Sequence, residues 1–267
     1  MSMPRRHWHD LPDTARAAVE HHTGPVHSAI TAPAGVNSAV AATLHTAADT
    51  VFVKGVPTDH PQVRTQQREA AINPHLPAAS PRLRFHVQAA GWDLIGYQHL
   101  TGRHADYTPG SQDLPHAAAA LGELQAIGCP AGVPVKDARA RWQRYTDDAE
   151  LFDGPALLHT DLAPHNMLIT DRAHLIDWAW PTRGAAWIDP AVIILRLMEA
   201  GHTAPEADTW ARRFASWRAA PRAAVAAFSR ANAHLWDEIA RSDPQPWKKD
   251  LSRHAHDWVT YWNNRDV

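Results

Sequence analysis

Residues 159–166 read His159-Thr160-Asp161-Leu162-Ala163-Pro164-His165-Asn166, and Ile176-Asp177-Trp178 follows. Three short apolar runs surround these polar residues, at 156–158, 167–169 and 174–176. Each run is long enough for one short β-strand, and each adjoins a polar side chain. The stretch therefore predicts a β-ribbon that presents Asp161, Asn166 and Asp177.

Two carboxylates and one amide in this order suit phosphoryl transfer. Catalysis of that reaction is mostly positioning and neutralisation of charge. One carboxylate can lie beside an attacking hydroxyl, while the amide and the second carboxylate hold Mg²⁺. The pattern H-x-D-x-x-x-x-N followed by an Asp resembles the catalytic loop and metal-binding Asp of kinases.

The segment resembles the aminoglycoside phosphotransferase and choline-kinase-like family, which shares the two-lobed kinase fold. That family has a Pro shortly before the Asn, as Pro164 is here, and I-D-W or I-D-F in place of D-F-G. A short D-P-A segment then follows, matched by residues 189–191. The resemblance implies that the γ-phosphoryl group of ATP, or alternatively GTP, is moved to a hydroxyl of a small molecule such as an antibiotic.

The resemblance also implies roles for single residues. Asp161 is the expected catalytic residue, beside the acceptor hydroxyl, and Asn166 and Asp177 are the expected Mg²⁺ ligands. His159 is expected to brace the loop by hydrogen bonding. Three tryptophans lie near the metal segment, which contains Asp177, and they are Trp178, Trp180 and Trp187. One of these three is a candidate for lining the acceptor pocket.

The upstream half contains a strand-like run that ends in a lysine. Residues 51–54 alternate β-branched and aromatic side chains and end at Lys54, and residues 62–72 contain no helix breaker. By the resemblance, Lys54 reaches the α- and β-phosphates of the nucleotide and Glu69 on the helix pairs with Lys54. A partnered buried lysine keeps its charge, whereas an isolated one loses it.

The loop at 33–39 lies between strand-like stretches at 26–31 and 40–45. The resemblance places the loop that covers the nucleotide phosphates here, with Ser38 as a candidate ligand. A plain hairpin is the alternative, because Gly35 and Asn37 are turn formers. No Walker A pattern occurs in the chain, which excludes a P-loop nucleotide-binding site.

Residues 93–102 read as a strand that runs into a hinge. In the family the adenine edge binds hinge backbone, which places that contact between Gln98 and Leu100. The alternative is a strand followed by a simple turn at 101–102. The expected boundary between a nucleotide-binding N-lobe (1–98) and a C-lobe that binds metal and acceptor (99–267) lies at this hinge.

The order of elements predicts an α+β fold, and the resemblance implies that it is the two-lobed protein-kinase-like fold. An N-terminal antiparallel sheet with one helix, preceded by a short helix at 13–20, makes the first lobe. The second lobe is mainly helical and carries the catalytic β-ribbon. Proline and glycine residues separate its expected helices, which are 113–127, 135–149, 190–200, 206–219, 222–241 and 247–263.

Composition excludes several other classes. With a net charge of −2, neither nucleic acid nor an anionic membrane is an expected partner, and no obligate protein partner is inferred. No run approaches the length of a membrane-spanning helix. The single Cys129 suggests a reducing, cytoplasmic environment. The 19 histidines lack the spaced cysteine and histidine ligands that zinc requires, so surface histidines are expected.

Two alternatives to a small-molecule kinase stay open. A catalytically silent nucleotide-binding module is disfavoured because every expected catalytic position is occupied. A protein kinase is disfavoured because no A-P-E signature follows the metal segment. Residues 190–267 hold nine Asp and Glu against eleven Lys and Arg, which argues against a strongly cationic acceptor.

Overall fold

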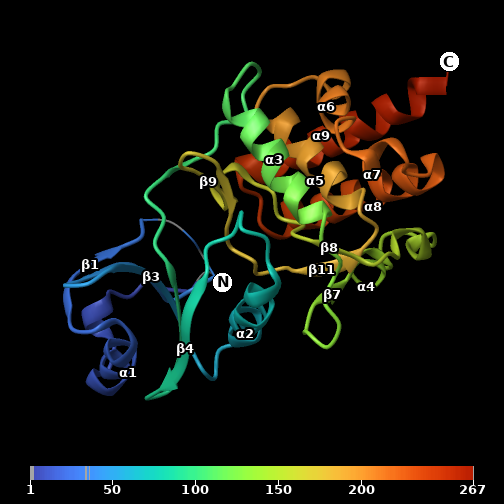
Figure 1. Cartoon of the computed structure of the whole chain (residues 1–267). Coiled ribbons are helices and arrows are strands. Elements are labelled where there is room, and N and C mark those ends of the chain that lie inside the picture. Colours follow the sequence, from blue (N-terminus) through green and yellow to red (C-terminus); the bar gives the residue numbers. More distant parts are fainter. Residues whose placement is uncertain (1–2, 34, 36, 267) are drawn as a thin grey trace. The chain divides into compact units, whose positions relative to one another are not determined.

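The computed structural model describes residues 3–33, 35 and 37–266 and divides into two compact units (Figure 1). The first unit comprises Met1–Thr101 together with Asp177–Ala179. The second comprises Gly102–Ile176 and Trp180–Val267. The segment that contains Asp177 therefore belongs to the first unit, although its neighbours in sequence belong to the second.

A five-stranded sheet forms the centre of the first unit, in the order β1-β2-β3-β5-β4. Every pairing in it is antiparallel, as the sequence predicted. Helix α1 (Asp13–Thr23) and helix α2 (Val63–Ile72) accompany the sheet. The strands are β1 (Val26–Thr31), β2 (Val40–Thr46), β3 (Thr50–Pro57), β4 (Leu83–Ala89) and β5 (Trp92–Gln98).

The two faces of this sheet bury different sets of side chains. Val51 and Val53 on β3 belong to a core cluster with Trp8 and Leu11. Because side chains alternate along a strand, Lys54 lies on the opposite face. Helix α2 packs there, and its Ala70 contributes to a smaller cluster with Ile95 and Tyr97 of β5. The alternation of β3 thus presents Lys54 to α2.

The second unit is mainly helical, which confirms the predicted α+β class. None of the helices among the described residues is both long and apolar enough to cross a membrane. The unit also holds two small three-stranded sheets, in the orders β10-β9-β6 and β7-β11-β8. Its helices are α3 (Asp113–Gln125), α4 (Ala138–Trp142), α5 (Ile188–Glu199), α6 (Ala204–Ala211), α7 (Ala215–Arg218), α8 (Arg222–Ser242) and α9 (Pro246–Asn263).

The three predicted strands of the β-ribbon segment form, and they belong to two sheets. Strand β8 (Ala156–Leu158) pairs with β11 (Thr182–Gly184), which itself pairs in parallel with β7 (Lys136–Asp137). Strand β9 (Met167–Ile169) pairs with β10 (Ala173–Leu175) and with β6 (Arg103–His104). The chain turns sharply at Thr160, whose φ is +63°, and this turn separates β8 from β9.

Two predicted helices are also interrupted. The expected helix 135–149 is helical only over α4, because Lys136 and Asp137 pair with β11 instead. Asp137 then caps α4 by accepting the N–H of Ala140 at 3.0 Å. The expected helix 206–219 is split into α6 and α7, and the intervening carbonyls of Arg212 and Arg213 accept hydrogen bonds from Arg218.

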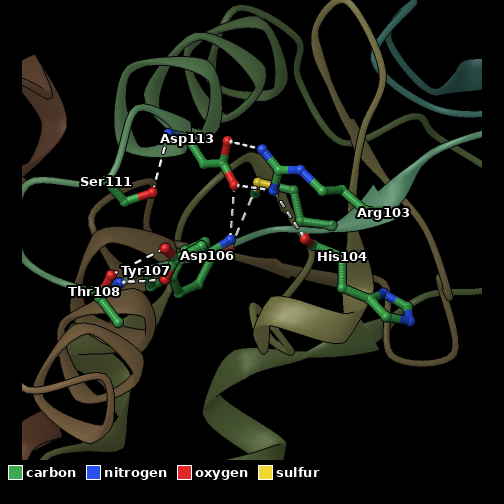
Figure 2. Close-up of polar contacts among 8 residues, drawn as sticks. Arg103, His104, Asp106, Tyr107, Thr108, Ser111 and Asp113 are labelled. Atoms are coloured by element: carbon green, nitrogen blue, oxygen red, sulfur yellow. Dashed lines mark hydrogen bonds and ion pairs between the residues drawn. The ribbon is translucent and has the colours of Figure 1, made fainter.

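A buried carboxylate fixes the segment that enters the second unit (Figure 2). Asp113 accepts hydrogen bonds from both terminal nitrogens of Arg103, one at 2.7 Å, and from the N–H of Asp106 at 2.8 Å. The hydrogen bond from Arg103 is the main cause that holds the pKa of Asp113 below its ordinary value. Arg103 pairs with Ile169 of β9, so Asp113 also secures the strand that follows the catalytic loop.

A methyl group at Gly96 should destabilise the first unit. A Cβ at this position would lie 2.3 Å from two ring atoms of Phe85, which is buried on β4. The ring has to shift, at a cost of about 1–3 kcal/mol. Gly122→Ala is the control, because no atom lies within 4 Å of that Cβ in α3. Urea unfolding should show a lower midpoint for Gly96→Ala only, and an unchanged midpoint would contradict this packing.

Candidate active site

Lys54 lies between two carboxylates of the first unit. Its Nζ is 2.8 Å from Oε1 and 3.1 Å from Oε2 of Glu69, and 3.0 Å from Oδ1 of Asp177. The structure therefore brings together the strand lysine, the helix glutamate and the metal-segment aspartate that the sequence singled out. Carboxylates from two other segments thus fix the position of this ammonium group.

Burial decides the electrostatics of this cluster. The side chain of Lys54 is 15% exposed and that of Glu69 is 8% exposed. Burial lowers the pKa of Lys54, but the charges of Asp177 and Glu69 outweigh it, so the pKa is raised and the lysine stays charged. Burial raises the pKa of Glu69 against the opposing charge of Lys54. Burial, followed by the charge of Glu69, raises the pKa of Tyr97 well above its ordinary value.

A second buried carboxylate anchors helix α2. Gln66 lies on the buried face of α2, three residues before Glu69, and donates its Nε2 to Asp93 Oδ1 at 2.6 Å and to Asp93 O at 2.7 Å. The other oxygen of Asp93 accepts from Gln88 at 2.7 Å and contacts His86 Nε2 at 2.9 Å. This cluster holds α2 one turn away from the Lys54 pair, so it sets where Glu69 lies.

Asp177 has an unusual backbone conformation. Its φ is +60°, which a residue other than glycine adopts at a cost of about 1–3 kcal/mol. The next residue is buried and donates its indole N–H to Ser80 Oγ at 3.2 Å, within the first unit. Such strain persists only where the surroundings impose it, and it is concentrated at functional sites. Here it accompanies a carboxylate that is bonded to Lys54.

The catalytic loop lies in the second unit between β8 and β9. Asn166 ends a short 3-10 helix, Pro164–Asn166, and donates its Nδ2 to the carbonyl of Asp161 at 3.0 Å. His159 donates its Nε2 to the carbonyl of Ile176 at 2.9 Å, and its Nδ1 accepts the N–H of Asp161 at 3.3 Å. These contacts brace the loop on both sides of Asp161, which is the role that the resemblance implied for His159.

Asp189 holds the strained start of the loop. This carboxylate is 1% exposed and accepts the N–H of His159 at 2.8 Å and that of Thr160 at 2.9 Å. Thr160 is β-branched and has a left-handed φ, a conformation that is a genuine outlier without such support. Burial raises the pKa of Asp189, and the hydrogen bond from His159 opposes that rise. The sequence marked Asp189 as part of a motif but did not indicate this role.

Arg141 supports the same loop from α4. Its Nη1 donates to Oγ1 of Thr160 and, at 2.7 Å, to Oγ1 of Thr182. Both hydroxyls donate to the carbonyl of Trp180, at 3.1 Å and 2.8 Å respectively. Burial lowers the pKa of Arg141 to about 10, against the charges of Asp189 and Asp161. Sequence reasoning missed Arg141, because one continuous helix was expected there.

The carboxylate of Asp161 faces an arginine of α5. Arg196 Nη2 lies 3.6 Å from Asp161 Oδ1, and Arg196 Nη1 donates to Glu199 at 3.0 Å. The side chain of Asp161 is 38% exposed, whereas that of Arg196 is 11% exposed. The predicted catalytic carboxylate is therefore accessible and lies beside a cation that the sequence did not single out.

The other residues predicted to contact the nucleotide lie in a loop, at a strand end or outside regular structure. Ser38 lies in the connection between β1 and β2, where its carbonyl accepts from Arg5 at 3.0 Å, and residues 34 and 36 of that loop lie outside the described residues. Gln98 ends β5, and its N–H is engaged by Arg82 O at 2.8 Å, so an adenine contact there would use its carbonyl. Leu100 follows outside regular structure. The binding roles of these residues stay predictions.

Comparison with known proteins identifies the fold. No protein-family model matches the chain, and no curated protein matches its sequence. The structure of an aminoglycoside phosphotransferase from Alicyclobacillus acidocaldarius is similar, with a TM-score of 0.62, 13% identity, and 96% of this chain and 97% of that chain covered. A thermostable variant of aminoglycoside phosphotransferase APH(4)-Ia, in a ternary complex with ADP and hygromycin B, has a TM-score of 0.60 and 12% identity over 94% and 98% of the chains.

LicA in complex with AMP is similar over 89% of this chain and 92% of that chain, with a TM-score of 0.60 and 14% identity. The chain therefore has the kinase-like fold of the aminoglycoside phosphotransferases. This result confirms the predicted architecture.

Asp93→Asn should destabilise the first unit in a pH-dependent way. Burial raises the pKa of Asp93, but hydrogen bonds from His86, Gln88 and Gln66 outweigh it and hold the pKa below its ordinary value. The ionised carboxylate stabilises the folded state by about 1–3 kcal/mol. This stabilisation is fully present above the pKa of Asp93 in the unfolded chain, about 4. It is lost as the pH falls through the lower pKa that Asp93 has in the folded protein.

Urea unfolding at pH 7 and pH 3 measures this effect. The difference in the free energy of unfolding between wild type and Asp93→Asn should be large at pH 7 and smaller at pH 3. Asp59→Asn, at an exposed aspartate of the same unit, is the control and should change stability by less than about 0.5 kcal/mol. A difference of equal size at both pH values would show that the charge of Asp93 does not anchor α2.

Proposed function

We propose that this protein is a phosphotransferase that moves the γ-phosphoryl group of ATP, or alternatively GTP, to a hydroxyl of a small molecule. The observation that carries the proposal is Lys54, a buried ammonium held by Glu69 and Asp177. Phosphoryl transfer in kinases requires an ion pair between a strand lysine and a helix glutamate, and Lys54 of β3 and Glu69 of α2 form such a pair. The similarity to the fold of known phosphotransferases supports the same reading.

The proposed roles follow the parts that phosphoryl transfer requires. Lys54, oriented by Glu69, contacts the α- and β-phosphates. Asp161 lies beside the acceptor hydroxyl, orients it and takes its proton late, because the transition state is largely dissociative. The loop with Ser38 and the backbone from Gln98 to Leu100 would complete the nucleotide site. In this proposal residues 1–98 bind the nucleotide and residues 99–267 bind the acceptor.

In this proposal Asn166 and Asp177 are the residues that would hold a magnesium ion. Asn166 uses its amide nitrogen on Asp161 O and accepts no hydrogen bond from any described residue at its amide oxygen. The side chain of Asp177 is 34% exposed and shares one oxygen with Lys54. The N–H of Ile176 binds the carbonyl of Asn166 at 3.0 Å, and Asp177 is the next residue. Bound Mg²⁺ would neutralise charge on the transferred phosphoryl group.

No group of three or more His, Cys, Asp or Glu among the described residues could hold a metal ion alone. Magnesium commonly binds through one or two carboxylates together with substrate phosphates, so the proposed site depends on the nucleotide. We place the reaction in the cytoplasm, where nucleoside triphosphates are available. A catalytically silent module of the same fold is the second candidate, and turnover distinguishes it from an enzyme.

Asp161→Asn should retain nucleotide binding and lose turnover. The substitution keeps the shape of the side chain but removes the carboxylate that positions the acceptor hydroxyl, so turnover should fall by about 10²–10⁴-fold. The measurement is ADP release with a panel of small hydroxylated acceptors, beside calorimetric titration with Mg·AMP-PNP. Asp171→Asn, at an exposed residue after β9, is the control. Near-normal turnover of Asp161→Asn would remove Asp161 from the reaction.

A further inference from the structure

The surroundings of Asp161 indicate the charge of the acceptor. Arg141 is a partly buried cation that donates to Thr160, the residue immediately before Asp161. Its hydrogen-bond partners are hydroxyl groups, and no carboxylate of the described residues lies within 4.0 Å of its guanidinium. A charge that is partly removed from water and has no direct counter-ion is costly, so an anionic ligand beside it would be stabilised.

A partly exposed tryptophan joins this cation to a second one. The side chain of Trp180 is 40% exposed, and its backbone carbonyl accepts the hydroxyl of Thr160. Lys136 Nζ lies 4.2 Å from the centre of the indole ring and the guanidinium carbon of Arg141 lies 5.3 Å from it. The ring therefore holds two cations near the residue that precedes Asp161. We call Lys136, Arg141 and Trp180 the basic cluster.

A third cation approaches Asp161 from another helix. On α5, Nη2 of Arg196 lies 3.6 Å from Oδ1 of Asp161, and the guanidinium carbon of Arg196 lies 5.4 Å from the ring centre of Trp236. The carboxylates nearby are also engaged, since Asp189 binds the loop backbone and Glu199 binds Arg196. Basic side chains from β7, α4 and α5 therefore lie around Thr160 and Asp161.

We propose that the acceptor carries an acidic group, a carboxylate, phosphate or sulfate, next to the hydroxyl that is phosphorylated, and that the basic cluster and Arg196 bind this group. Arginine binds such planar or tetrahedral anions in a bidentate way, and the indole of Trp180 can pack on the body of the acceptor. A polyamine would meet like charge at these positions. The inference rests on the proposed function for the reaction, but the charge of the site can be tested separately.

The test is calorimetric titration of inorganic phosphate into protein saturated with Mg·AMP-PNP, which leaves the nucleotide phosphate positions filled. Wild type should bind phosphate, and Arg196→Gln and Lys136→Gln should each weaken it about tenfold, the loss expected for one charge-assisted hydrogen bond. Arg196→Lys should restore part of the affinity. Arg139→Gln, on the same helix α4 and 56% exposed, should bind as wild type does. Spermidine should not bind.

Three results would overturn the inference: no phosphate binding to wild type, wild-type phosphate affinity in both glutamine variants, or binding of spermidine that depends on Asp161. Arg141→Gln is a further variant, but Arg141 supports the loop at Thr160, so this variant could fail to fold. The variants of Lys136 and Arg196 test the inference without it. If the protein does not bind Mg·AMP-PNP at all, the proposed function fails. The phosphate titration of the nucleotide-free protein and its variants then still decides the charge of the site.

Discussion

The ammonium of Lys54, buried between Glu69 and Asp177, is the interaction on which the first unit depends. Removing one carboxylate would leave a buried charge uncompensated, so β3, α2 and the short segment at Asp177 must all keep their places. The fold uses further polar groups to ensure this, since Gln66 and Asp93 hold α2. The strained backbone of Asp177 is a conformational cost that these surrounding contacts offset.

In the second unit, polar side chains likewise hold a strained segment, the loop at Thr160 and Asp161. Thr160 adopts a backbone conformation that its β-branched side chain disfavours, and Asp189 and Arg141 hold it from two different helices. These groups act on the backbone and hydroxyl beside Asp161 and leave its carboxylate accessible. Under the proposed function, a rigid loop of this kind would position an acceptor hydroxyl without rearranging, which would lower the entropic cost of the reaction.

Local pattern was enough to predict the α+β class, the strand at β3 and the helix at α2, because alternation and an uninterrupted helical run are short-range features. The pairing of Lys54 with Glu69 was predicted from the resemblance to the phosphotransferase family, since local pattern alone does not show which helix residue meets the lysine. Strand β11 is three residues long and has no pattern of its own, so the sheet that it builds, and the end of α4, could not be foreseen. Arg141 and Asp189 act across long sequence separations, and only the tertiary structure reveals such contacts.

A thermal melt with and without Mg·ATP, on wild type and on Asp177→Ala, tests the central claim most directly. Saturation at about a hundred times the dissociation constant should stabilise wild type by roughly 2.7 kcal/mol if only the folded state binds. The account predicts this shift with Mg²⁺ present, a smaller one without it, and its loss in Asp177→Ala. A wild type that neither Mg·ATP nor Mg·GTP stabilises would contradict the account, and the lysine cluster would then be structural.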